Sequence, residues 1–232
     1  MKSVLAVLAV VAFACTVTVA LPATRAGVGS VAAPQPPQWG GADKWTAQVN
    51  ILQAYNWTFT YYHDDTVNAD RYEHKAPQYD EMCAVGKQPY ASNTNLDCVV
   101  LYATDGWSYI NFPSETDACC KCENSFGAVR GDWLQNGGTT YSGQTTLDDT
   151  TVDHWVKSGN QVNNYYCTSD DSHLPVRYYE MWKPGEPKEW DFDLTTFSSG
   201  SSAFSSSLLS PPPSSSSCSD LCTSSVCEKY RQ

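Results

Sequence analysis

Apolar and polar side chains alternate along three stretches of the chain, residues 44–51, 55–61 and 190–195. The apolar positions hold mostly aromatic and β-branched residues, and a period of two with these residue types predicts β-strands that bury one face. The His63-Asp64-Asp65 sequence after the second stretch has the composition of a hairpin turn. These three stretches therefore predict antiparallel strands with one aromatic-lined face.

The rest of the chain continues this pattern. Clusters of Gly, Asn, Asp and Pro separate the apolar stretches, as turns between strands require, and no stretch of 12 residues has a helical period, although residues 131–135 could form one short helix. The sequence predicts an all-β, mainly antiparallel fold with a large sheet that is curved or paired. Further strands are expected over residues 71–75, 98–102, 107–112, 152–157, 162–167 and 176–182.

Composition excludes several classes of protein. Apolar residues make up 41% of the 232 residues and aromatic residues 12%, enough to build a core, so the chain is not wholly disordered. The net charge of −11 argues against binding to nucleic acid or to an anionic membrane surface. One domain with an appendage fits this length.

The first residues have the pattern of a secretory signal. Lys2 precedes an apolar run over residues 4–19, and Thr18-Val19-Ala20 offers small residues for cleavage after Ala20, with a second candidate cut after Ala26. The run is shorter than the roughly 20 residues of a membrane span. We therefore predict a signal peptide over residues 1–20, a β domain over residues 21–197, and a secreted protein, extracellular or lysosomal.

A low-complexity stretch, residues 198–217, follows the predicted domain. Twelve of its 20 residues are Ser, and it includes Pro211-Pro212-Pro213, so we predict a flexible insert. Residues 218–232 then bring three cysteines, which are expected to staple this tail to the domain.

Ten cysteines indicate an oxidising compartment, and nine remain after the predicted cleavage. The Cys119-Cys120-Lys121-Cys122 cluster lacks the paired spacing and nearby His of a zinc site, so disulfides are the preferred interpretation. Adjacent Cys119 and Cys120 should have different partners, because successive side chains of an extended strand point in opposite directions. One of the nine is left free or pairs with another chain. The predicted disulfide-forming set is Cys83, Cys98, Cys119, Cys120, Cys122, Cys167, Cys218, Cys222 and Cys227.

Asn56-Trp57-Thr58 is the only N-glycosylation sequon. Asn56 falls on the polar side of its predicted strand, where a glycan projects into water, so it is the predicted glycosylation site.

Several short motifs follow one another in a fixed order: PPQWGG at Pro36–Gly41, FTYY at Phe59–Tyr62, LYATDG at Leu101–Gly106, TYSG at Thr140–Gly143, LPV at Leu174–Val176, then Phe192-Asp193, Pro211–Pro213 and Cys218. In this order the chain resembles the ependymin family of secreted glycoproteins over residues 36–218. The Ser-rich insert and the extra thiol of the mid-chain cluster depart from the family pattern.

The resemblance implies a fold similar to that of bacterial lipoprotein carriers. Such a fold has two stacked curved sheets or a half-open barrel around a deep apolar pocket. It also implies lipid or matrix binding, association with calcium, cell–matrix adhesion and a homodimer. By the same resemblance, the mid-chain cluster pairs with Cys218, and Cys83 or Cys98 pairs with Cys222 or Cys227.

Two candidate sites follow. The rings of the predicted strands would line a lipid pocket, since apolar walls favour burial of acyl chains, or would simply fill a core. Acidic pairs in predicted turns would bind calcium through their oxygens, or would be solvated turns; no other cofactor is expected. The candidate ligand-binding residues are Trp45, Trp57, Phe59, Trp107, Tyr109, Tyr178, Trp182, Trp190 and Phe192. The candidate calcium ligands are Asp64, Asp65, Asp148, Asp149, Asp170 and Asp171.

An enzyme is not expected, because the chain carries no nucleophile elbow, zincin, P-loop or dinucleotide-binding motif. His154 with nearby Asp148, Asp149 or Asp153 could form a dyad, and paired carboxylates could serve a glycosidase, but neither has a spacing that singles it out. The alternative function is an extracellular carbohydrate- or matrix-binding module in which exposed Trp and Tyr stack on sugar rings.

Overall fold

The computed structural model describes residues 34–52, 57–76, 83, 96–115, 119–123, 128–159, 161–183, 186–212, 218 and 222. All of them belong to one compact unit, Pro34–Gln232. The predicted signal peptide, Asn56, Cys227 and the side chain of Trp182 lie outside the described part of the chain.

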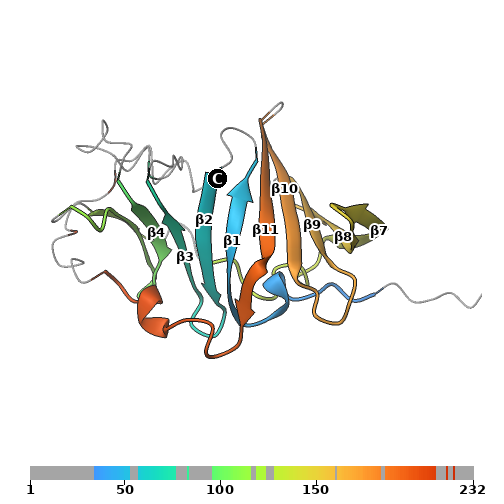
Figure 1. Cartoon of the computed structure of the whole chain (residues 1–232), viewed down its shortest axis with the longest axis horizontal. Coiled ribbons are helices and arrows are strands. Elements are labelled where there is room, and N and C mark those ends of the chain that lie inside the picture. The colour runs from blue at the N-terminus through green and yellow to red at the C-terminus, as the bar shows by residue number, and fades with distance from the viewer. Residues whose placement is uncertain are drawn as a thin grey trace, which may run out of the picture. The chain divides into compact units, whose positions relative to one another are not determined.

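The alternating stretches form one antiparallel sheet of eleven strands, with the order β6-β5-β4-β3-β2-β1-β11-β10-β9-β8-β7. Figure 1 shows the strands from β4 through β1 and β11 to β7 side by side. The strands are β1 (Lys44–Ile51), β2 (Trp57–Asp64), β3 (Ala69–His74), β4 (Cys98–Tyr102), β5 (Trp107–Asn111), β6 (Cys119–Glu123), β7 (Thr139–Leu147), β8 (Thr150–Ser158), β9 (Val162–Thr168), β10 (Pro175–Lys183) and β11 (Glu186–Ser199).

The all-β antiparallel prediction is confirmed. Consecutive strands pair with each other except β6 and β7. The pairing of β1 with β11 joins the two ends of the series, so that β6 and β7 are the two edges. The strands therefore form a single sheet that does not close into a barrel. Residues 131–135, considered as a helix, form successive turns instead.

One side of the sheet, here called the first face, is packed with aromatic rings. The short 3-10 helix η1 (Trp39–Gly41) lays Trp39 over them, with ring centroids 5.2 Å from Tyr165, 6.2 Å from Phe192 and 6.5 Å from Trp45. Trp45 and Tyr165 are completely buried. The Trp-Gly-Gly sequence thus covers the centre of the sheet.

Over β3, β4 and β5, the opposite or second face is covered by residues 200–212, here called the C-terminal strap. Leu209 from η2 (Ser206–Leu209) is fully buried in a small cluster with Leu101 and Tyr109. Arg71 donates a hydrogen bond from Nη1 to the Leu208 carbonyl oxygen at 3.2 Å. In this part of residues 198–217, which the sequence predicts to be a flexible insert, two apolar side chains, Phe204 and Leu209, pack the Ser-rich segment against the sheet.

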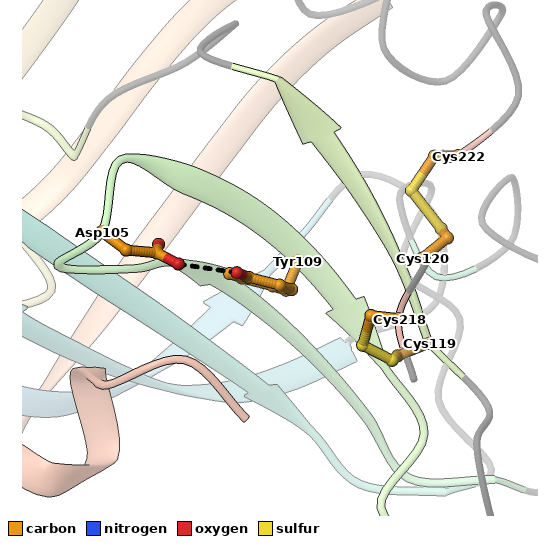
Figure 2. Close-up of a disulfide and its surroundings, with 6 residues drawn as sticks. All are labelled: Asp105, Tyr109, Cys119, Cys120, Cys218 and Cys222. Carbon is orange, nitrogen blue, oxygen red and sulfur yellow. Dashed lines mark hydrogen bonds between the residues drawn. A yellow bond between two sulfur atoms is a disulfide. The ribbon is translucent and has the colours of Figure 1, made fainter. Parts of the chain in front are cut away.

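Disulfides fix the C-terminal segment to edge strand β6. Cys119 pairs with Cys218 and Cys120 pairs with Cys222, as Figure 2 shows beside the 2.7 Å hydrogen bond from Tyr109 to Asp105. The expected partner of Cys218 and the different partners of the adjacent cysteines are confirmed. Cys122 is also disulfide-bonded.

The predicted pairing of Cys83 or Cys98 with the tail is wrong. These two cysteines pair with each other across 15 residues, with their Cα atoms 6.0 Å apart. Because β4 lies two strands from β6, Cys98 is remote from the edge to which the tail is attached. Cys167, also assigned to the disulfide set, is a free and buried thiol.

The cover over the first face generates a prediction about Gly40. Its φ is +69°, and a Cβ atom there would collide with the Trp45 indole, whereas Gly137, also at +69°, has open space around it. Gly40→Ala should lower the free energy of unfolding by about 2–4 kcal/mol, and Gly137→Ala by about 1 kcal/mol, in urea titrations followed by fluorescence. Equal losses would show that backbone strain alone matters and that the contact with Trp45 does not.

Candidate functional site

The predicted ligand-binding rings separate onto the two faces of the sheet. Trp107 and Tyr109 lie on the second face, where Tyr109 is buried beneath the C-terminal strap and Lys121 Nζ lies 4.6 Å from the Trp107 ring centroid. The single aromatic-lined surface expected from alternation is therefore divided, because strand β5 pairs in a register that turns these rings away from Phe59.

Among the first-face rings, three fill the core and line no open surface. Trp45, Phe59 and Phe192 are 0%, 3% and 5% exposed. Their rings contact those of other buried residues, with centroid separations such as 6.0 Å between Trp45 and Phe192. For these residues, core packing is the structural role, and the hypothesis that they contact a ligand directly is not supported.

The remaining rings belong to a row that crosses seven strands. Cross-strand pairing places one apolar residue of each of these strands opposite the next. Besides Tyr141 on the edge strand β7, four neighbouring members are only partly buried: Tyr178, Trp190, Ile51 and Trp57. We call the whole set the aromatic row: Tyr141, Trp155, Tyr165, Tyr178, Trp190, Ile51 and Trp57. It is the candidate functional site.

Trp190 lies among the partly exposed residues of the aromatic row and is held by rings beneath it. Its centroid lies 5.6 Å from Phe59, 6.1 Å from Tyr72 and 5.5 Å from Tyr178. These tilted and edge-to-face contacts are the favoured geometries of aromatic pairs. The ring therefore offers a preorganised apolar surface.

A polar row borders the aromatic row two residues further along the same strands. Its members pair across β8, β9, β10 and β11 and are Lys157, Asn163, Glu180 and Lys188. The Tyr178 hydroxyl lies between the two rows, 2.7 Å from Glu180 Oε2 and 2.6 Å from Asn163 Oδ1. Burial and then the Glu180 charge raise the pKa of Tyr178, so its hydroxyl keeps its proton. The site thus combines flat apolar rings with one compact set of oxygens.

Sequence reasoning did not find the polar row, although its residues alternate with ring residues along β10 and β11. The spacing of two between Tyr178 and Glu180 and between Lys188 and Trp190 was the available signal. Which strands carry these residues side by side depends on the register, which the sequence alone does not give.

A buried network around Asp70 was also missed. His63 Nδ1 lies 2.7 Å from Asp70 Oδ1, while the Tyr61 hydroxyl and the Val129 N–H donate to Oδ2 at 3.0 and 2.8 Å. Trp39 Nε1 donates to the Tyr61 hydroxyl at 3.3 Å. His63 and Asp70 are 0% exposed. This network holds the Trp39 cover and the segment around Val129 against the sheet, beyond the reach of solvent.

The predicted calcium ligands lie in separate turns. Asp64 accepts a hydrogen bond from Thr66 N–H at 3.1 Å, and Asp65 accepts one from Gly131 N–H at 2.7 Å. Asp148 and Asp149 form the β7–β8 turn with positive φ angles of 45° and 65°.

The third pair lies between β9 and β10. Asp170 accepts from Thr168 Oγ1 at 2.7 Å, and Asp171 is exposed. Within the described ranges, no three His, Cys, Asp or Glu side chains gather as metal ligands do. Calcium binding stays a prediction.

The dyad considered around His154 is replaced by other contacts. His154 Nε2 lies 2.9 Å from Asn164 Oδ1, and its ring stacks on Tyr166 with centroids 4.4 Å apart. Asp153, the next residue along the strand, accepts a hydrogen bond from Tyr141 at 2.9 Å.

Three disulfides joining described residues indicate an oxidising environment, extracellular or periplasmic. A search of the described residues finds no helix with the length and hydropathy needed to cross a membrane.

Comparisons with known proteins show limited similarity. No protein-family model matches the chain, and no curated protein matches it. An uncharacterized conserved protein from Thermus thermophilus has 10% identity and a TM-score of 0.48, covering 72% of this chain and 84% of that chain.

Two other solved structures contain MucB. The Pseudomonas aeruginosa MucA/MucB complex has 13% identity and a TM-score of 0.39, covering 77% of this chain and 58% of that one. MucB in complex with MucA(peri) has 9% identity and a TM-score of 0.30, with coverage of 73% and 54%. Similarity at this level does not extend to function.

The free thiol of Cys167 yields a prediction. Burial, followed by the Asp153 charge, raises the pKa of Cys167 to about 12, and the thiolate is the reactive form. Peptide mapping after iodoacetamide treatment at pH 8 should find Cys167 unmodified in the native protein and fully modified in urea. Rapid modification of the native protein would contradict the buried position of this thiol.

Proposed function

We propose that this protein binds a hydrophobic ligand, a lipid or a similar amphiphile, on the partly exposed part of the aromatic row. The main support is a set of four partly exposed apolar residues beside the buried aromatic core. They pair across four adjacent strands and are Tyr178, Trp190, Ile51 and Trp57. Covering such a surface is favourable by about 25 cal/mol per Å² of apolar area.

Rigidity adds to this argument. Trp190 packs on Phe59 and Tyr72, which are themselves buried. A ligand that binds to a ring already fixed in place loses less free energy to ordering than one that must immobilise mobile side chains. The row therefore suits an extended or flat apolar group lying across the strands.

We further propose that the chain is an ependymin-related secreted glycoprotein. The ordered motifs support this, and two of them have structural roles: the Trp-Gly-Gly sequence forms the cover over the first face, and Leu101–Gly106 forms the end of β4 and the turn to β5. Calcium association, cell–matrix adhesion, glycosylation at Asn56 and a homodimer are expectations that follow from this resemblance.

One observation favours the alternative, a carbohydrate- or matrix-binding module. On the second face, half-buried Tyr166 and Tyr179 lie on β9 and β10 opposite Arg177 and Glu189. Rings beside charged groups are able to stack on sugars and bind their hydroxyl groups. Retention on a polysaccharide column, with no lipid seen in native mass spectrometry of the purified protein, would favour this alternative.

A matched pair of tryptophans tests lipid binding. The neutral fluorescent probe N-phenyl-1-naphthylamine should bind the wild-type protein, and Trp190→Ala should weaken binding at least tenfold, since tenfold corresponds to about 55 Å² of lost apolar contact. Trp107→Ala, a partly buried ring on the other face, should change the dissociation constant less than twofold. No binding to the wild type, or equal losses in both variants, would overturn the proposal.

A further inference from the structure

We propose that the polar row contacts the head group of the bound amphiphile and binds a neutral, hydroxylated head group more tightly than an anionic one. This inference rests on the proposed function and adds a chemical class of ligand to it. On β8, β9, β10 and β11 the polar row lies two residues from the aromatic row, a separation of about 7 Å along the strands. An apolar chain that lies on the aromatic row and ends at Tyr178 therefore has its head next to Glu180.

Around the Tyr178 hydroxyl, the oxygens of Glu180 and Asn163 outnumber the hydrogen-bond donors between them. Glu180 Oε2 and Asn163 Oδ1 both lie within hydrogen-bonding distance of the Tyr178 hydroxyl, at 2.7 and 2.6 Å, but that hydroxyl has a single proton. Tyr178 therefore donates to one of the two oxygens, and the other keeps a lone pair that can accept from a ligand.

The amide of Asn163 does not supply the missing donor. Its Nδ2 donates to the Gln161 carbonyl oxygen at 3.2 Å, which fixes the amide orientation with Oδ1 toward Tyr178. Gln161 itself has a buried Oε1 with no partner among the described residues. The corner formed by β9 and β10 is thus rich in acceptors, and ligand hydroxyl groups are donors of the matching kind.

The charges nearby favour the same class of ligand. The Glu180 side chain is 13% exposed, whereas Lys188, whose Nζ lies 4.0 Å from Glu180 Oε1, is 30% exposed. The other lysine of the polar row, Lys157, donates from Nζ to the Gly137 carbonyl oxygen at 2.6 Å. An anionic head next to Tyr178 would meet the Glu180 carboxylate first, and this repulsion opposes binding, while a hydroxyl group would donate a charge-assisted hydrogen bond to it.

The contribution of the head group to binding is measured with three ligands that share one acyl chain: 1-monolauroylglycerol, methyl laurate and laurate. Each is titrated as a competitor of N-phenyl-1-naphthylamine. Monolauroylglycerol should bind the wild-type protein about tenfold more tightly than methyl laurate, because only the glycerol head donates hydrogen bonds to Glu180 and Asn163. Laurate should bind more weakly than either, because the Glu180 carboxylate repels its charge.

Glu180→Gln keeps the shape of the side chain but removes its charge. Monolauroylglycerol should then bind about fivefold more weakly and laurate about threefold more tightly, while methyl laurate changes less than twofold. A purely structural defect would weaken all three together. The matched control is Glu189→Gln, the same substitution on β11 at a residue that pairs with Arg177 on the other face, and it should leave all three unchanged.

The outcomes distinguish the two proposals. Equal affinity of the three ligands for the wild-type protein, or equal changes in Glu180→Gln, would overturn the head-group inference and leave hydrophobic binding intact. Failure of the wild-type protein to bind the probe or any of the three ligands would overturn both.

Discussion

The packing of Trp39 against the rings of the first face is the interaction on which the rest of the structure depends. A single open sheet has two large faces, and its apolar face must be covered if it is to leave water. Trp39 lies over rings of β1, β9, β10 and β11 and joins strands from both halves of the sheet. Its indole N–H also leads through Tyr61 to the buried carboxylate of Asp70.

Covering the second face depends on a different device. Near β3 to β5 a Ser-rich segment with two apolar anchors lies on the sheet, and disulfides attach the chain beyond it to β6. The backbone N–H of Cys222 also donates to Lys121 on that strand at 2.9 Å. The β6 edge is thus held by covalent and hydrogen bonds. Hydrophobic burial dominates on the first face, and cross-links supplement a small apolar cluster on the second.

The candidate site lies where the cover of the first face gives way to partly exposed rings. Register alone produces it, because each of seven strands contributes one apolar residue to the aromatic row, a ring on every strand but β1. Two positions away, β8 to β11 each contribute one polar residue to the polar row. A ligand surface with an apolar part and an acceptor-rich end is thereby built on rigid strands. Loops are not needed to place these groups.

The sequence by itself determined the class of fold, because period-two alternation of rings with polar residues is a local property that survives in the sheet. It also determined that Cys119 and Cys120 have different partners, since neighbouring side chains on a strand point apart. Only the tertiary structure decided that Trp107 faces away from Trp190, that Cys83 joins Cys98 and that Leu209 anchors a Ser-rich strap. The physical reason is that alternation fixes which side chains share a face within one strand, whereas strand order and register, set by contacts between residues far apart in the chain, decide which strands bring their faces together.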